Sequence, residues 1–307
     1  MPSQICTPKI QRMNKRNRYK RLNRYIYHQK IRLLASKVSN MNKTMSLLLL
    51  LLYVSSFSQE STTFSSYETL EDVKTIEINN NLCVIFYPTY FYGVSIKGDK
   101  SIKDIIKTEF KNSVLKLYTT AENSLTSYAE ITIYIKDLKE LRLLGTSWVQ
   151  TDKKIITDSF KIHSTENGNF NLPIECKNFS LFSNLESKGS IFIESEMIQI
   201  HMKGSSEISM KLNATNVSVE QKDNSYVGLN GKAQLLTANI DNKAQLSAWN
   251  LKTKDVFLNS SSSKDIRIHA ENRLKIKDKG TAMIYVKGNP KQIDTLHISK
   301  KSKIIFE

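Results

Sequence analysis

Two histidines and one glutamate are the residues in this sequence best spaced to do chemistry together. His163, Phe182, His201 and Glu220 follow one another at intervals of 19 residues. If that interval is a structural repeat, His201 and Glu220 lie on neighbouring coils and can form an acid–base pair. His163 and His201 would then lie roughly 10 Å apart, too far for both to bind one metal ion at ~2 Å. We interpret the column as a solvated surface ladder, with no catalytic residue and no metal site.

The familiar motifs of catalysis are missing. The sequence contains no Gly-x-Ser-x-Gly, His-Glu-x-x-His, Cys-x-x-Cys or Walker A phosphate-loop motif, each of which places a nucleophile, metal ligands or a phosphate cradle. We therefore predict a protein without enzymatic activity and without a cofactor. An enzyme acting on polysaccharide is the alternative, because it needs only a cluster of carboxylates on adjacent coils.

The aromatic residues gather most densely in one short segment, which contains Phe86, Tyr87, Tyr90, Phe91 and Tyr92. Exposed rings of this kind form a stacking platform for a sugar or a partner protein. The alternative is a half-buried pair of strands joined by a turn at Pro88. On the first interpretation, Tyr87, Tyr90 and Tyr92 are the candidate ligand-binding residues.

The elements that must position these residues are short strands that repeat. Apolar residues at i and i+2, the period of a strand, recur with steps of 19, 19, 19, 19, 19, 20 and 18 residues. The pairs are Leu141/Leu143, Phe160/Ile162, Phe179/Leu181, Ile198/Ile200, Val217/Val219, Leu236/Ala238, Val256/Leu258 and Leu274/Ile276. A second series lies between them, at Phe170/Leu172, Ile191/Ile193, Ile208/Met210, Val227/Leu229, Leu246/Ala248, Ile266/Ile268 and Met283/Tyr285.

A unit of about 19 residues without a helix cannot bury its own apolar face, so its copies must stack. We predict an all-β fold, a parallel β-solenoid with coils of about 19 residues over 145–307. Aligning the coils by this step gives an outward column of Leu144, His163, Phe182, His201, Glu220, Asn239, Asn259 and Lys277. A sandwich of antiparallel hairpins is the alternative, but sandwiches do not require five equal steps.

Residues 70–144 precede the repeat and form an irregular β region that caps the solenoid as part of one continuous domain. Strands are expected at 75–78, 83–86, 93–96, 114–117 and 131–135, where apolar and polar residues alternate. Ile102, Ile105, Ile106 and Phe110 fall on one face of a helix, so a short helix is expected over 101–110.

The first sixty residues have the composition of targeting segments. Residues 41–58 combine Lys43, an apolar run from Leu47 to Val54 and a Ser-Phe-Ser site, which is the layout of a secretory signal peptide cleaved between Ser58 and Gln59. The apolar run is shorter than the ~20 residues of a membrane-spanning helix. Residues 59–69 are expected to form a linker, and the mature chain to contain no membrane span.

Residues 1–40 hold eleven Lys or Arg and no acid. We interpret them as a disordered upstream extension created by a mis-assigned start codon, the alternative being a basic arm for nucleic acid or anionic lipid. Beyond Ser58 the chain has 33 basic and 29 acidic residues, a balance of +4. That balance argues against a nucleic-acid-binding body.

Two cysteines, Cys83 and Cys176, follow the signal segment. An exported protein can pair them in a disulfide, and the alternative is two small buried apolar residues. Nothing in their spacing decides between the two.

The order of segments resembles a known family, the auto-transporter adhesin "head GIN" domain of Bacteroidota envelope proteins. The resemblance is carried by Val94–Asp99 (VSIKGD), Asn112–Leu117 (NSVLKL), Ile131–Ile135 (ITIYI), Leu138–Gly145 (LKELRLLG) and, most specifically, Tyr285–Pro290 (YVKGNP). It implies an exported right-handed parallel β-helix in the cell envelope, at its surface, in the periplasm or secreted, with no assigned activity. It also implies adhesin-like binding of an envelope or extracellular partner, a glycan or a protein. A carbohydrate-binding module on the same scaffold is a further alternative.

Overall fold

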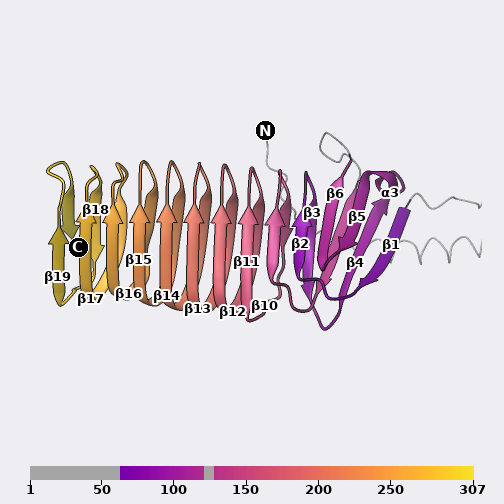
Figure 1. Ribbon diagram of the computed structural model, residues 1–307, viewed down its shortest axis with the longest axis horizontal. Helices are drawn as coiled ribbons and strands as arrows, with labels where there is room; N and C mark the ends of the chain where they lie inside the picture. The colour runs from indigo at the N-terminus through magenta and orange to yellow at the C-terminus, as the bar shows by residue number, and fades with distance from the viewer. Residues whose placement is uncertain (1–62, 121–127) are drawn as a thin grey trace, which may run out of the picture. The chain divides into compact units, whose positions relative to one another are not determined.

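The structure is a computed structural model that describes residues 63–120 and 128–307, and every structural statement below concerns these residues. One 20-stranded sheet coils into a β-solenoid of about nine turns, and its strands stand side by side in Figure 1. The elements are β1 (Thr63–Leu70), β2 (Thr75–Ile78), β3 (Cys83–Pro88), β4 (Tyr92–Asp99), α3 (Ile102–Ile105), β5 (Ile106–Lys111), β6 (Val114–Thr119), β7 (Ala129–Ile135), β8 (Glu140–Leu143), β9 (Trp148–Gln150), β10 (Ile155–Ile156), β11 (Ser159–Ser164), β12 (Asn169–Ser183), β13 (Lys188–Met202), β14 (Glu207–Gln221), β15 (Tyr226–Ile240), β16 (Gln245–Ser260), β17 (Ile266–Asp278), β18 (Met283–Lys287), β19 (Gln292–Leu296) and β20 (Lys303–Phe306).

The predicted 19-residue solenoid is confirmed. Strands β12 to β15 are 15 residues long and pair in parallel, so that Leu181 faces Ile200 and Ile200 faces Val219. These three side chains point inward and are 0% exposed. Each fully buried aliphatic side chain contributes on the order of 1.5–3 kcal/mol relative to an exposed one, so the inward columns hold the coils together.

The first step of the repeat is longer than predicted. Ile162 pairs with Leu141 and His163 with Arg142, an offset of 21 residues. The residue next to His163 in the outward column is therefore Arg142, and the expectation of Leu144 is wrong. This coil contains the extra short strand β10, which the apolar pairs alone did not reveal.

Two members of the second series are also misaligned. Phe170 pairs with Gly189, because a Cβ at Gly189 would lie 2.2 Å from the Phe170 ring and glycine leaves that space for it. Ile284 and Val286 pair with buried β17 residues, whereas Met283 is 43% exposed. Four consecutive apolar residues over 283–286 made the two alternations indistinguishable in the sequence.

Each turn between coils contains one residue in the left-handed conformation. These residues are Gly145, Glu166, Leu185, Gly204, Asp223 and Asn242, with φ between 58° and 71°. A serine two positions later often closes the turn, as Ser187 donates to the Asn184 carbonyl at 3.0 Å and Ser225 to the Lys222 carbonyl at 2.8 Å. A non-glycine residue pays a steric cost in this conformation.

Leu185 offers a direct test of that cost. It is 50% exposed and has φ 59°, so little packing is lost when the side chain is removed. We expect Leu185→Gly to raise the free energy of unfolding by about 0.5–1 kcal/mol, measured by urea denaturation. Gly204→Ala is the opposite control, because its Cβ would lie 2.8 Å from the Leu185 backbone, and it should destabilise. A loss of stability in Leu185→Gly would contradict the assignment of strain to this turn.

The region before the repeat enters the stack out of sequence order. Strand β2 pairs in parallel with both β6 and β8, and β3 with both β7 and β9. The first strands thus lie between two later coils. Strands β4, β5 and β1 then pair antiparallel to finish this end of the sheet. The five expected strands are present, and β1, β3, β4 and β7 form the cap sheet used below, in the order β3–β7–β4–β1.

Two expectations for this region are wrong. Residues 63–69 are not linker, because β1 pairs with β4 along its whole length; Phe64 packs against the core. The helix expected over 101–110 is confined to α3, since β5 pairs with β6. The sequence signal that was missed is the turn at Asn112 and Ser113, whose φ values of 52° and 61° suit a two-residue hairpin.

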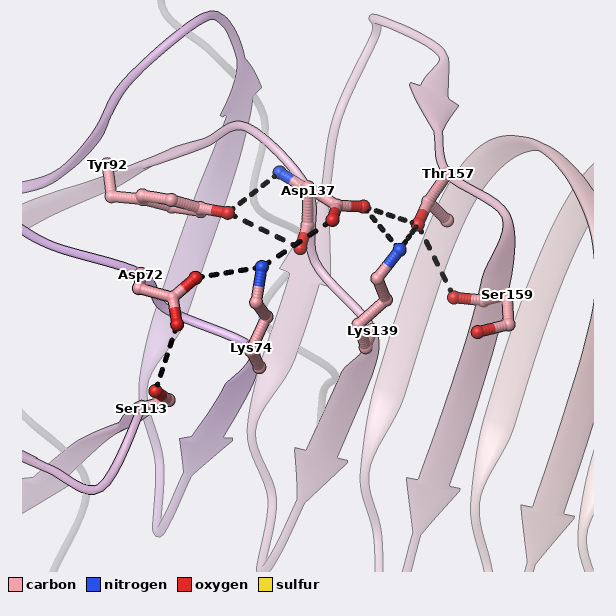
Figure 2. A network of polar contacts seen from close by, with 8 residues as sticks. All are labelled: Asp72, Lys74, Tyr92, Ser113, Asp137, Lys139, Thr157 and Ser159. Carbon is pink, nitrogen blue, oxygen red and sulfur yellow. Dashed lines mark hydrogen bonds and ion pairs between the residues drawn. The ribbon is translucent and has the colours of Figure 1, made fainter.

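A polar network joins the cap to the first coils, and Figure 2 shows it centred on Asp137. The Asp137 carboxylate lies 2.6 Å from Lys139 and 3.6 Å from Lys74, and accepts a hydrogen bond from Thr157 at 2.8 Å. Its backbone N–H donates to the Tyr92 hydroxyl at 3.2 Å. Desolvation raises the pKa of Asp137, but the hydrogen bonds from Lys139 and Thr157 and the charge of Lys74 outweigh it, so the pKa lies below its ordinary value.

We expect Asp137→Asn to lower the free energy of unfolding by about 1 kcal/mol at pH 7, since the network loses charge-assisted bonds at a partly exposed site. Because the folded-state pKa is depressed, the advantage of Asp137 is present above the unfolded carboxyl pKa of about 4 and is lost as the pH falls through the folded value. Urea denaturation at pH 7 and at acidic pH measures this.

Asp158→Asn is the matched control for that experiment. The Asp158 side chain is 82% exposed and its carboxylate lies 3.8 Å from Lys177. Equal losses in the two variants would show that net charge, and not the network, determines the result.

Candidate functional sites

The ring ladder is a stack of three side chains on the outer face of β11, β12 and β13. The rings of His163 and Phe182 lie 4.7 Å apart at 8°, and those of Phe182 and His201 lie 4.9 Å apart at 4°. Parallel pairing places the three residues opposite one another on successive coils. The column from His163 to Glu220 is thus in the register that the sequence predicted.

Each end of the ladder meets a carboxylate. His163 Nε2 lies 3.3 Å from Glu140 Oε1, and His201 Nδ1 lies 3.0 Å from Glu220 Oε2. Desolvation lowers the pKa of His163, while Glu140 opposes this and Lys161 and Arg142 add to it. The pKa of His163 therefore lies below its ordinary value, and the ring is neutral at pH 7.

A groove with a volume of about 400 Å³ follows the ladder, and Lys203 and Lys222 also line it. Because the rings stack face to face, a ligand in the groove meets ring edges and paired charges. Glu140 and Glu220 are four coils apart, roughly 19 Å, whereas paired carboxylates that cleave glycosidic bonds lie about 5–9.5 Å apart. Within the described residues, no group of three or more His, Cys, Asp or Glu could hold a metal ion.

The stacking itself should contribute to stability. We expect Phe182→Leu to lower the free energy of unfolding by about 1–2 kcal/mol, because two aromatic contacts worth about 0.5–1.5 kcal/mol each are lost. Urea denaturation measures the change. Phe192→Leu is the matched control: Phe192 points outward from β13 and is 51% exposed. Similar losses at the two positions would show that stacking adds nothing beyond burial.

A second surface, the aromatic patch, lies on the outer face of the cap sheet. It consists of Tyr67 on β1, Tyr87 on β3, Tyr134 on β7 and Tyr90 and Phe91 in the turn after β3. Tyr67, Tyr87 and Tyr90 are 56%, 42% and 83% exposed. The sequence signal included Tyr87, Tyr90 and Phe91, but it missed Tyr67 and Tyr134, which lie far away in the chain and join the patch only through strand pairing.

Tyr134 is the centre of the aromatic patch. Its ring centroid lies 5.2 Å from that of Phe91, 5.7 Å from that of Tyr87 and 6.0 Å from that of Tyr67. Strand pairing places Tyr87 and Gly93 on either side of Tyr134. A Cβ at Gly93 would lie 3.1 Å from the Tyr67 hydroxyl, so glycine lets the Tyr67 ring lie over β4 and reach Tyr134.

Tyr92 does not belong to this surface, and its prediction as a ligand-binding residue is wrong. Its side chain is 8% exposed, and its hydroxyl donates to the Asp137 carbonyl at 3.4 Å. The reason is the alternation of β4: Tyr92 points into the core, on the face opposite to Gly93. It holds the cap network in place.

The cysteines do not bridge β3 and β12. Cys176 is a free, buried thiol, and burial is the main cause that raises its pKa. The expected Cys83–Cys176 disulfide is therefore wrong, and Cys176 is the small buried residue of the alternative. The signal segment and the Ser58–Gln59 cleavage site lie outside the described residues. None of the described helices is long and apolar enough to cross a membrane.

Stacked parallel coils with an antiparallel cap, which display rows of polar and aromatic side chains, define an exported-adhesin class of β-solenoid. One family profile matches residues 73–192 and again residues 182–290. The chain belongs to this family, which is described as putative auto-transporter adhesin, head GIN domain. That description implies export.

Solved structures with similar folds support the architecture. A putative adhesin from Parabacteroides merdae is 15% identical, with a TM-score of 0.58 over 81% of this chain and 97% of the other. A putative adhesin from Parabacteroides distasonis is 14% identical, with a TM-score of 0.56 over 81% and 95%. A putative lipid binding protein from the same species is 18% identical, with a TM-score of 0.51 over 81% and 98%. At these identities the likeness concerns the fold alone, and no curated protein matches the chain.

Proposed function

We propose that this chain is an exported, non-enzymatic binding module of the bacterial cell envelope with an adhesin-like role. The observation that carries the proposal is the aromatic patch, a preassembled and exposed ring cluster on a rigid solenoid. Clustered exposed aromatics of this kind mark binding surfaces. The family and the titles of the similar structures agree with such a role.

An enzyme acting on polysaccharide is a weaker reading of the same scaffold. The carboxylates beside the ring ladder each pair with a basic or imidazole group, as Glu140 lies 2.9 Å from Arg142 and Glu220 lies 3.0 Å from His201. Their separation of roughly four coils leaves no pair that could act across one glycosidic bond. A binding role needs neither arrangement.

The proposal predicts that the coils are displayed outside the cell. Protease shaving of intact cells, followed by mass spectrometry, should release peptides from 145–290, and a strain without the gene should attach less to surfaces. A peptide that begins at Gln59, and none from 1–58, would support the predicted signal cleavage. Protection of the coils until the outer membrane is broken would contradict the adhesin role. A periplasmic marker protein serves as the control for intact cells.

A further inference from the structure

We propose that the aromatic patch binds a neutral glycan, through stacking of sugar C–H faces on the rings of Tyr87, Tyr134 and Tyr67. This inference rests on the proposed binding function and names its ligand. The rings form a row that crosses the cap sheet from β3 to β1, three strand spacings or roughly 14 Å. A row of this kind suits a linear chain of sugar units lying across the strands.

The size of the exposed surface favours a glycan over a protein. An aromatic side chain has on the order of 150–250 Å² of surface, so the three exposed tyrosines, at 56%, 42% and 83%, present on the order of 400 Å². A stable protein interface buries about 800 Å² on each partner. The aromatic patch is therefore too small for such an interface, but it is large enough for a few sugar units.

The surroundings of the rings are suited to sugar hydroxyls. Strand pairing places Thr132 and Ser95 beside Ile85 in the next row of the cap sheet, and Thr69 pairs with Gly93 in the row of Tyr134. Three hydroxyls and the phenols of the aromatic patch can all donate and accept hydrogen bonds. Lys153, with Nζ 3.7 Å from the centre of the Tyr87 ring, is the cation in direct contact with the patch, and the ring satisfies it by a cation–π contact.

The rings are held in place before a ligand arrives. Tyr87 and Tyr67 meet Tyr134 edge to face at 61° and 71°, and such contacts restrict their rotation. Binding then costs less side-chain entropy. Since the rings are tilted and not coplanar, the surface fits a soluble, twisted glycan chain better than a flat crystalline one.

Affinity gel electrophoresis and calorimetry of the full mature chain with soluble polysaccharides test this inference. The probes are β-1,3-glucan, mixed-linkage β-glucan and galactomannan, with polygalacturonate as the anionic comparison. We expect at least one neutral glycan to bind, and Tyr90→Ala, Tyr87→Ala and Tyr67→Ala each to weaken that binding about tenfold. Gly93→Ala should weaken it less, because it displaces the Tyr67 ring by only a few tenths of an ångström.

Tyr128→Ala is the matched control variant. Tyr128 is 63% exposed and lies next to the same cap sheet, but its hydroxyl donates to Glu130 at 3.1 Å and its ring is outside the aromatic patch. We expect its affinity to equal that of the wild type. Circular dichroism of each variant shows that the fold is retained.

Three results would overturn the inference: no neutral glycan binds, Tyr128→Ala weakens binding as much as Tyr90→Ala, or only polygalacturonate binds and Lys153→Ala alone abolishes it. None of these removes the proposed function, because attachment of cells carrying the patch variants is measured separately. If the variants lose glycan binding but cells still attach, adhesion uses another surface. If wild-type cells do not attach more than the deletion strain, the adhesin role itself fails.

Discussion

The rest of this structure depends on backbone hydrogen bonding between parallel coils. Each coil donates to and accepts from its neighbours at a spacing of about 4.8 Å, so residues at equivalent positions must lie directly above one another. Inward positions then form closed apolar columns such as Leu181, Ile200 and Val219. Outward positions form ladders whose chemistry is set by the sequence at one step of the repeat.

The turns are where this constraint acts most strongly on the choice of residue. A coil can return to its neighbour only if one residue at each corner is left-handed, and Asp223 and Asn242 do this without glycine, at φ 61°. The close stacking of corners is the reason that Gly204 has no room for a Cβ beside Leu185. Buried serines at the corners satisfy carbonyl groups that a coil leaves free.

Much of the solenoid could be predicted from the sequence because inward residues repeat at a fixed step and strand alternation is local. The column from His163 to Glu220 follows from that step alone, and so does its failure as a metal site. What could not be predicted is non-local: the insertion of β2 and β3 between later coils, the antiparallel pairing of β1, and the 21-residue coil before His163. For the same reason Tyr67 and Tyr134 were missed, since only tertiary pairing brings them to Tyr87.

The contrast between the ring ladder and the aromatic patch shows where a solenoid can bind. In the regular coils, equal spacing lets His163, Phe182 and His201 stack at 4° and 8°, so the rings cover one another's faces. In the cap, antiparallel strands and the glycine at position 93 break the column, and the rings meet at 61° and 71°. Such tilted rings leave faces uncovered. A stacking ligand therefore finds its surface where the repeat is interrupted, and the regular coils serve as the rigid support that carries that surface.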